Sequence, residues 1–428
     1  MRIINPKIKL KKLLHKIWVS AFVWRILFIL ILMFNFFFIA QEKITNLQTN
    51  WERRKTADTL SDREYFDAVY SIALKQLEST RKKFLGDPTA VFRVTQSLRD
   101  LETNRSEALT FPLLTRGILF ANLIESNLSG DKVLKKYYQE FLKQKIYILD
   151  QTADGDALIY LEQTTHNPEY QNKIEEMATY LIERSKKEGG TLAFRPWQDG
   201  KKSVRHVDTL GLACPFLAHY GSVYNKPEAT ELAVRQVLDF IQYGLDSKSG
   251  LSFQGYNPSY SNLSVGAAGW GRGVGWYALG LVNTAIWLPK ESKELDKLTQ
   301  AINDLARGIV RYQQSDGGYL GLLTANVEHY DSSATSILTY FLKVARTQGW
   351  IGPEYDGAIL RGVASLKAHT RSNGIVDDAQ GVCMGLNQMS SQYGPETYAQ
   401  GMTLELMGTI TRGQVLNDFF QEHHESRN

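Results

Sequence analysis

Two kinds of apolar pattern take turns along most of the chain. Over 170–182 and 298–312, apolar side chains recur every three or four residues, and in 170–182 Glu and Lys stand on the opposite side. This spacing predicts surface helices that bury one face. Other segments are apolar or small on nearly all faces, which predicts helices buried on most sides: 155–165, 207–221, 270–288, 332–345 and 396–410.

The alternation of these two helix types predicts a double ring of helical hairpins, in which the inner helices are packed on both sides. An open solenoid also alternates, but it more often repeats a consensus at a fixed period, and we find none. Strand patterns are too scarce for a sheet domain. We therefore predict an all-α, six-hairpin (α/α)6 barrel over 61–411. About twelve helices are expected, at 61–84, 108–127, 131–148, 153–165, 169–187, 206–223, 227–243, 271–288, 291–313, 332–348, 354–369 and 396–411.

The N-terminal region predicts one transmembrane helix before the barrel. Residues 18–40 are mostly apolar, interrupted by Arg25 and Asn35, and at 1.5 Å per residue they can cross a hydrocarbon core of about 30 Å. The basic segment 1–17 predicts a cytoplasmic N-terminus, with the barrel periplasmic or extracellular and inner-membrane lipid around the helix. Residues 41–60 are expected to form a linker, and 412–428 a polar tail.

A cleaved signal peptide is the alternative interpretation of this segment. Its apolar region is usually shorter, about 7 to 15 residues, and its cleavage site carries small residues at both key positions. Here the stretch is longer, and Phe38 interrupts the small-residue pattern before Ala40. The sequence therefore favours an uncleaved anchor.

Composition and charge narrow the function classes. The chain is 43% hydrophobic and 22% charged, which excludes a disordered protein. The first 40 residues contain seven basic residues and no acid, so the rest is mildly acidic and predicts no nucleic-acid partner. Two cysteines, Cys214 and Cys383, are too few for a disulfide-rich scaffold or a Cys-based zinc site. One disulfide bond between them is possible, but both stand in apolar contexts, which favour free thiols. Neither paired metal-ligand histidines nor a phosphate-binding loop occurs, so we expect no metal and no cofactor.

The segments that precede the inner helices are expected to meet at one mouth of the barrel. They are rich in Asp, Gly, Arg and aromatic residues, and loops held by a rigid scaffold commonly carry sites. These segments are 149–155, 204–209, 266–273, 328–333 and 392–397.

Two carboxylates at this mouth are candidate acids. Asp150 and Asp208 each stand just before an apolar helix. Each could simply cap its helix, and Asp154 competes with Asp150 for that role. Desolvation beside a buried helix could instead raise their pKa values, as a general acid needs. Two carboxylates at one mouth resemble the paired acids of glycoside hydrolysis.

The segment 270–276 combines glycines, an arginine and two tryptophans. Arg272 offers a planar fork of donors suited to a carboxylate, and Trp270 and Trp276 offer faces for a sugar ring. Tight helix packing through small residues is the alternative. Further aromatic residues fall in or beside the mouth segments, where each could equally be ordinary packing: Trp197, Tyr256, Tyr260, Tyr330, Tyr393 and Tyr398.

Taken together, three motifs resemble the unsaturated glucuronyl and rhamnogalacturonyl hydrolases of glycoside hydrolase families 88 and 105. They are L-D-x-x-x-x-G at 149–155, V-D-T with P-F-L-A-x-Y-G at 207–221, and W-G-R-G-x-G-W-Y-A at 270–278. D-S-S-A-T from Asp331 is a weaker match, and the resemblance covers roughly 140–410. It implies a six-hairpin α/α barrel that hydrates the C4=C5 double bond of the unsaturated uronic acid left by polysaccharide lyases.

The resemblance also implies residue roles. Asp208 would be the principal acid and base, and Asp150 would help to orient the water and the sugar. Arg272 and Trp276 match family substrate-binding positions, and guanidinium geometry assigns Arg272 to the uronate carboxylate. We place four further residues in the substrate-binding region: Trp270, Gln254, Tyr256 and His206. Gln254 stands where the family commonly has a histidine, and glutamine cannot carry a charge.

Three functions are weighed on this basis. The leading hypothesis is a membrane-anchored hydrolase that acts on unsaturated uronyl oligosaccharides. The alternative is a non-catalytic polysaccharide-binding or assembly subunit in surface polysaccharide biosynthesis or export, which Gln254 and the anchor would suit. A sugar epimerase is disfavoured, because such enzymes need paired histidines at the mouth and only His206 and His329 are near. The glycan and the oligomeric state stay open.

Overall fold

The chain divides into two units, residues 1–55 and 56–428. The computed structural model describes residues 24–25, 27–37, 40–41, 44, 48, 51–53, 56, 59–83, 111–124, 130–194, 203–326, 329–383 and 385–412. The predicted basic segment 1–17 and Trp197 lie outside the described residues. Of the predicted tail 412–428, only residue 412 is described.

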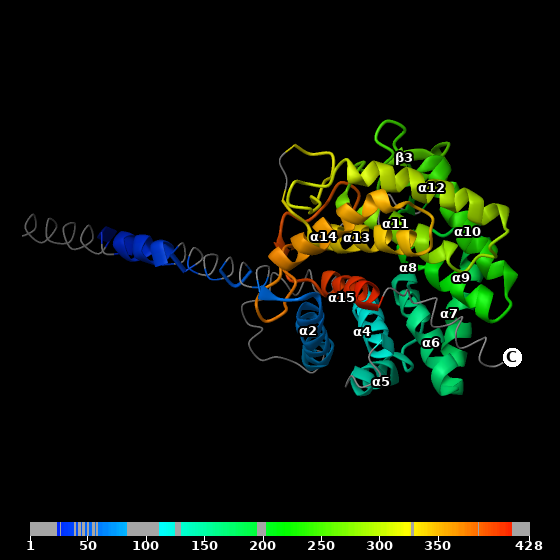
Figure 1. Ribbon diagram of the computed structural model, residues 1–428, viewed down its shortest axis with the longest axis horizontal. Coiled ribbons are helices and arrows are strands. Elements are labelled where there is room, and N and C mark those ends of the chain that lie inside the picture. Colours follow the sequence, from blue (N-terminus) through cyan, green and yellow to red (C-terminus); the bar gives the residue numbers. More distant parts are fainter. Residues whose placement is uncertain are drawn as a thin grey trace, which may run out of the picture. The chain divides into compact units, whose positions relative to one another are not determined.

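Twelve helices of the second unit form two sets that alternate along the described chain (Figure 1). One set is mostly amphipathic: α2 (Asp62–Lys83), α5 (Gly130–Phe141), α7 (Pro168–Lys187), α10 (Pro227–Tyr243), α12 (Lys293–Val310) and α14 (Asp356–Ala368). The other set is buried on most faces: α4 (Phe111–Ile124), α6 (Gly155–Thr165), α9 (Cys214–Val223), α11 (Gly271–Ala285), α13 (Ser332–Thr347) and α15 (Thr397–Arg412).

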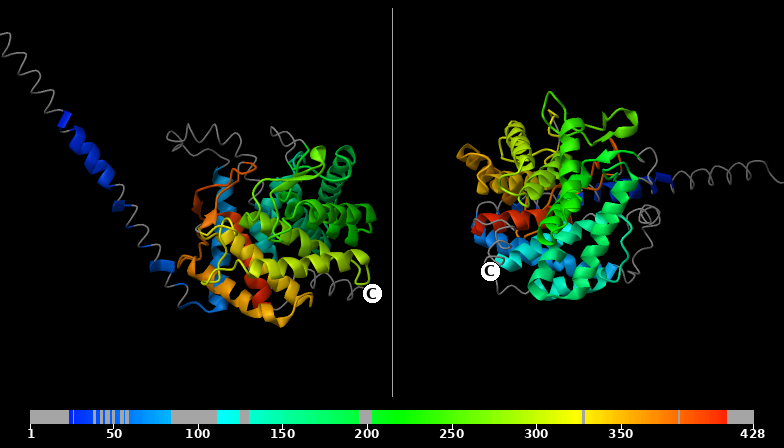
Figure 2. Two further views of the ribbon diagram at one scale, coloured as in Figure 1. Left: turned by 90° about the horizontal axis from the view of Figure 1, so that it is seen from above. Right: turned by 90° about the vertical axis from the view of Figure 1, so that its right-hand side faces the viewer.

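The buried helices close into a ring. Neighbours pack in the order α4, α6, α9, α11, α13 and α15, and α15 packs back against α4. Each amphipathic helix covers this ring from outside, and two views of the second unit at right angles show the arrangement (Figure 2). A closed ring excludes the open solenoid, so the predicted barrel of six helical hairpins is confirmed.

Local sequence explains both helix types. In α12 the side chains of Leu298, Ile302 and Leu305 are buried on one stripe, and Ser292 begins the helix by accepting a hydrogen bond from the Leu295 amide over 3.1 Å. In α11 all residues are buried, because the helix packs against inner helices and is covered by α12.

The single helix predicted over 206–223 is wrong. It is two helices, α8 (Asp208–Leu212) and α9, joined at Ala213. Pro215 explains the break, because proline has no amide hydrogen to donate and its ring conflicts with the carbonyl of the residue four positions earlier. The short 3-10 helix η3 (Leu149–Asp154) precedes α6 in the same region and packs against α8.

Short strands brace the loops that lead into the inner helices. One antiparallel sheet has the order β1 (Arg205–His206), β2 (Gly255–Asn257) and β3 (Leu263–Val265). A second pairs β4 (Ala379–Gln380) with β5 (Tyr393–Gly394). These pairs are too short to form a layer, and they fix loops to one another.

A buried ionic cluster lies inside the ring. The Arg116 guanidinium of α4 lies 2.6 Å from the Asp156 carboxylate of α6 and 2.9 Å from Glu405 of α15. His219 of α9 contacts the other Asp156 oxygen at 2.8 Å. Burial opposes the Asp156 charge, but Arg116 and His219 hold the pKa of Asp156 below its ordinary value. The cluster therefore ties four inner helices together through charges.

The N-terminal prediction falls only partly on described residues. Of the span 18–40, residues 18–23, 26, 38 and 39 lie outside them, whereas 27–37 is helical. No helix among the described residues is long and apolar enough to cross a membrane. Both cysteines are free, as predicted; Cys214 is buried and Cys383 is half-buried.

Candidate active site

The sheet β1–β2–β3 gathers four of the predicted site residues. His206 of β1 pairs with Gly255 of β2, which stands between Gln254 and Tyr256. The Val207 amide also donates to the Gln254 carbonyl over 2.9 Å. This pairing places His206, Asp208, Gln254 and Tyr256 in one small region at the start of α8.

Asp208 is half-buried and is the first residue of α8. The capping position of α8 belongs to Val207, and no side chain caps this helix end. The Asp208 charge acts on the guanidinium of Arg272 in α11, which α8 contacts directly. The Asp208 side chain therefore does not cap α8, and its role as an acid stays a prediction.

Asp150 is fully buried in η3, and η3 packs against α8. Its sequence neighbour Asp154 accepts hydrogen bonds from Thr115, Tyr137 and Tyr138 at 3.0 to 3.2 Å. Burial raises the pKa of Asp154 to about 6, against these hydrogen bonds, which lower it. Asp154 is thus held by structural partners, and the Asp150 carboxylate lies on the element that borders Asp208.

The guanidinium of Arg272 is held by the protein itself. It is 4% exposed, and Nη2 donates to the Gly381 carbonyl over 2.8 Å. Nη1 donates to the Gln380 carbonyl and to the Ser333 and Tyr398 hydroxyl groups. The group also lies over the rings of Trp270 and Tyr398, 5.1 and 4.8 Å from their centroids.

The charge of Arg272 is fixed in this setting. Burial opposes the charge, yet the pKa of Arg272 is raised by four neighbouring groups: Tyr398, Asp331, Cys383 and Asp208. A permanent positive charge therefore lies at the start of α11, where the charge of the candidate acid Asp208 acts on it. Its contact with a uronate carboxylate stays a prediction.

Asp331 holds the same loop through a backbone amide. Its Oδ1 accepts hydrogen bonds from the Ser333 amide and hydroxyl and, over 3.0 Å, from the Gln380 amide. The other carboxylate oxygen is buried and accepts no hydrogen bond from a described residue. Arg272 thus binds the carbonyls of residues 380 and 381, and Asp331 binds the Gln380 amide. We call this arrangement the loop clamp; it consists of Arg272, Asp331, Gln380 and Gly381.

Gln254 links two further loops. Its Oε1 accepts hydrogen bonds from the Ala267 amide at 3.2 Å and the Asn387 amide at 2.7 Å. Its Nε2 lies 3.7 Å from the Cys383 sulfur. A glutamine can donate and accept at once, which a fixed charge could not do here.

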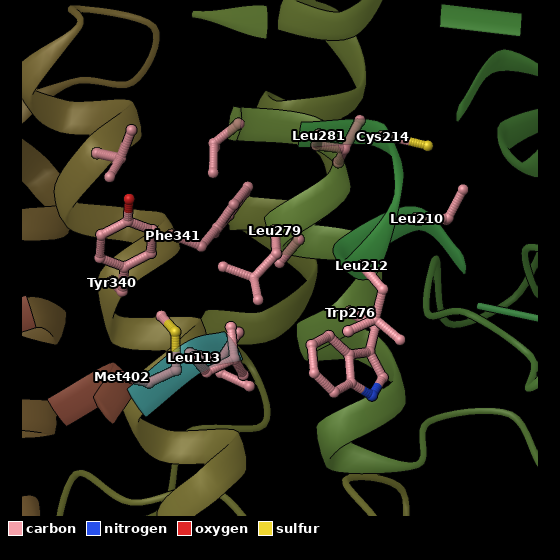
Figure 3. Close-up of a cluster of buried hydrophobic side chains, with 14 of the residues drawn as sticks. Leu113, Leu210, Leu212, Cys214, Trp276, Leu279, Leu281, Tyr340, Phe341 and Met402 are labelled. Atoms are coloured by element: carbon pink, nitrogen blue, oxygen red, sulfur yellow. The ribbon is translucent and has the colours of Figure 1, made fainter. Parts of the chain in front are cut away.

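Three predicted aromatic residues lie in the core. Trp276 is 3% exposed and belongs to the same buried hydrophobic cluster as Leu210, Leu212 and Leu279 (Figure 3). Trp270 is 2% exposed, and its indole donates to the Gln380 side chain over 2.8 Å. Tyr256 is fully buried. For these residues the structure shows packing, so a sugar contact by them stays a prediction.

The other predicted aromatic residues make ring contacts or are exposed. The ring of Tyr393 lies 5.1 Å from that of His329, and His206 lies 5.8 Å from Phe194. Tyr330 stacks on His369, and Tyr260 is largely exposed. Among the described residues, no group of three or more His, Cys, Asp or Glu side chains could hold a metal ion.

Sequence reasoning missed Glu396. This half-buried residue directly precedes α15, and the charges of Arg272 and Asp331 act on it. Burial raises the pKa of Glu396 to about 7; Arg272 opposes this shift and Asp331 adds to it. Its position in the sequence could have indicated it, because Glu396 precedes an inner helix as Asp150 and Asp208 do. The three motifs, however, include only Asp150 and Asp208.

Comparisons with known proteins agree with this architecture. A protein from Salmonella enterica described as a possible member of the GH105 family has a TM-score of 0.67 and 19% identity, covering 71% of this chain and 83% of its own. The unsaturated glucuronyl hydrolase from Bacillus sp. GL1 has a TM-score of 0.61 and 16% identity, covering 71% and 86%. At these identities the likeness shows the fold alone.

Sequence comparisons identify the family. Protein Atu3128 of Agrobacterium fabrum is 29% identical over 167 residues, which are 37% of this chain and 71% of that protein. The family model for Glycosyl Hydrolase Family 88 matches residues 128–408, which is more than half of the chain and runs from α5 into α15. The resemblance drawn from the three motifs is therefore confirmed, and the chain belongs to glycosyl hydrolase family 88.

Proposed function

We propose that this glycoside hydrolase removes the unsaturated uronyl residue from the non-reducing end of oligosaccharides by hydrating its C4=C5 double bond. The observation that carries the proposal is the half-buried Asp208, which heads α8 at the mouth beside the Arg272 charge. An acid in that place can deliver a proton to a substrate that the positive charge attracts.

The proposed reaction begins with proton transfer from Asp208 to C4. The electron pair of the double bond forms the new C–H bond, and C5 becomes oxocarbenium-like through its ring oxygen. Water, oriented by Asp150, adds to C5 and gives its proton to Asp208. The resulting hemiketal opens to a C5 ketone as its hydroxyl proton passes to the ring oxygen, which leaves C1 as a hemiacetal. C1 then becomes an aldehyde as the aglycone leaves with that proton as an alcohol. Asp208 ends protonated, so the cycle is complete without a covalent enzyme intermediate.

Arg272 acts by charge in this proposal. Its Nη atoms already donate to the loop clamp, so attraction of the uronate carboxylate does not require a free guanidinium fork. In this proposal five further residues line the substrate-binding region: Gln254, Tyr256, Trp270, Trp276 and His206. Gln254 also holds the two loops that border this region, through the amides of Ala267 and Asn387.

The proposed substrate can be tested directly. Full-length protein in mild detergent is incubated with oligosaccharides generated by a polysaccharide lyase, and the absorbance of the double bond is followed. Loss of this absorbance supports the hydrolase, whereas binding of the oligosaccharides without any loss supports a non-catalytic subunit. Gln254 favours that second function, because it offers no titrating group where the family commonly has one.

We further propose that the barrel is anchored in a membrane, with the N-terminus cytoplasmic and the barrel periplasmic or extracellular. The apolar segment 18–40 and the basic segment 1–17 support this. Large side chains from Trp24 to Phe37 are also exposed within their own unit. Reporter fusions after residue 60 test the topology, and activity of a cytoplasm-specific reporter alone would reject it.

A further inference from the structure

Asp331 joins the start of α13 to the loop at Gln380. It is fully buried and caps α13, where its Oδ1 accepts a hydrogen bond from the Ser333 amide over 2.9 Å. A helix cap needs only one such hydrogen bond to a short polar side chain. The same oxygen also accepts from the Ser333 hydroxyl over 2.6 Å and from the Gln380 amide over 3.0 Å. Asp331 therefore does more than begin a helix.

The Ser333 hydroxyl connects Asp331 to Arg272. A hydroxyl group has one hydrogen to donate and two lone pairs that accept. The hydrogen is donated to Asp331 Oδ1, so the lone pairs are left for Arg272 Nη1, which donates to Ser333 Oγ over 3.3 Å. The Asp331 carboxylate thus holds the hydroxyl in the orientation that accepts from the guanidinium.

The backbone of Gln380 makes a second connection within the loop clamp. Asp331 accepts a hydrogen bond from the Gln380 amide, and Arg272 donates to the carbonyl of the same residue. Holding the amide in place therefore also holds the carbonyl that the guanidinium contacts. Asp331 reaches Arg272 by two routes, and each route passes through a group of another residue.

The charge of Asp331 does not explain why a carboxylate stands here. Its negative charge acts on Arg272 and offsets part of the attraction that Arg272 exerts on an anionic ligand. A site that needed only a positive charge would bind an anion better without Asp331. The carboxylate instead supplies one oxygen that is a strong enough acceptor for three donors. Its benefit therefore lies in geometry.

We propose that Asp331 is a positioning residue, which holds the Arg272 guanidinium in place for the uronate carboxylate through the Ser333 hydroxyl and the Gln380 backbone. This inference rests on the proposed function and gives Asp331 no contact with the substrate. A neutral acceptor at the same place should serve this role. A side chain that caps α13 without reaching Gln380 should not.

Two neutral variants separate position from charge. Asp331→Asn keeps an acceptor oxygen for the three donors and removes the opposing charge, so the KM for lyase-generated oligosaccharide should fall. Asp331→Ser also removes the charge and remains a favoured helix cap, but its shorter side chain does not reach Gln380. Its KM should rise by about tenfold, as for one lost charge-assisted contact, with kcat nearly unchanged. KM values that rise in both variants, or in neither, overturn the proposal.

Ser292→Ala is the matched control for a lost helix cap. Ser292 caps α12, an outer helix, by accepting from the Leu295 amide over 3.1 Å. The variant should lose stability and keep the wild-type KM and kcat. If it raises KM as Asp331→Ser does, the effect comes from a weakened cap, and the proposal is overturned.

A double-mutant cycle tests whether Asp331 acts through Arg272. In the Arg272→Lys protein, Asp331→Ser should raise KM no further, because no guanidinium is left to hold. The same tenfold rise in both backgrounds overturns the proposal. If Asp331→Ser does not fold, Ser333→Ala decides, since it removes only the hydroxyl route. Its KM should rise beside Arg272 and not beside lysine, and an equal result in the two backgrounds overturns the role of Asp331.

The wild-type protein distinguishes failure of this inference from failure of the proposed function. Wild-type protein that neither binds these oligosaccharides nor consumes their double bond rejects the proposed function itself. If it binds them without turnover, the Kd from calorimetry replaces KM in the same comparisons. Wild-type binding together with any of the overturning results above rejects only the role of Asp331.

Discussion

Trp276 of α11 packs directly against Gly211 of α8. A Cβ atom on Gly211 would lie 2.5 Å from the indole ring and 3.1 Å from the Trp276 carbonyl oxygen. Only a residue without a side chain lets these two helices approach so closely. Since α8 begins at Asp208, this contact also sets where the candidate acid stands relative to α11.

Gly211→Ala should therefore destabilise the protein. The added methyl group overpacks a closed core, at a cost of about 1 to 3 kcal/mol. Gly308→Ala is the matched control, because its Cβ would lie 3.8 Å from the nearest atom and alanine favours a helix. Chemical denaturation compares the two proteins, and equal unfolding free energies would show that α8 and α11 can separate at no cost.

Asp208→Asn should abolish most turnover and leave the fold intact. Asparagine has nearly the same shape, but it cannot deliver a proton, and general acid–base catalysis contributes about 100-fold to 10,000-fold. Double-bond absorbance measures turnover, and calorimetry measures binding, which should survive. A variant with wild-type turnover would assign the proton transfer to another residue.

Arg272→Lys should weaken substrate binding by about 10-fold to 100-fold. Lysine keeps the charge but loses the planar fork, so it cannot hold both carbonyls of the loop clamp, and the charge that attracts the uronate carboxylate is no longer fixed in place. Loss of a charge-assisted contact costs roughly 1.5 to 3 kcal/mol. Calorimetric titration with oligosaccharide gives the affinity. An unchanged affinity in a folded variant would limit Arg272 to a role in structure.

Arg116→Met should cost about 3 to 5 kcal/mol of unfolding free energy. Removing the cation leaves the Asp156 and Glu405 carboxylates buried without it. Arg307→Met breaks an exposed ion pair with Asp304 on α12 and should change stability by no more than about 1 kcal/mol. If both variants lose equally little, the buried cluster does not hold the ring together.

Asp154 should make stability fall as pH rises from about 4 to 6. Its folded pKa of about 6 lies above the value of an unfolded aspartate, so between these values the folded state binds more protons than the unfolded state. The loss amounts to roughly 3 kcal/mol and is complete above pH 6. Asp154→Asn removes this titration, so the difference in unfolding free energy between the two proteins should change across that window and be flat above it.

The barrel could be predicted because helix periodicity is a local property. The stripe at Leu298, Ile302 and Leu305 follows from spacing alone, and the apolar run at 271–285 implies burial on all sides. The break before Pro215 was readable as well, but the continuous apolar pattern of 207–221 concealed it.

The site could be predicted only in part, because its contacts join distant positions. Arg272 meets Gly381 across more than a hundred residues, and no spacing rule reports such a contact. The same holds for Trp276, whose burial depends on Gly211 in another helix. Glu396 resembles any polar loop residue until Arg272 and Asp331 surround it.

The loop clamp has an implication for how this barrel could acquire new substrates. It fixes the chain at Gln380 and Gly381, and the pairing of β4 with β5 fixes it again at Tyr393. The stretch between these anchors belongs to none of the inner helices whose contacts close the ring. This loop could therefore be replaced, by evolution or by design, so that a different glycan fits while the helical barrel stays the same.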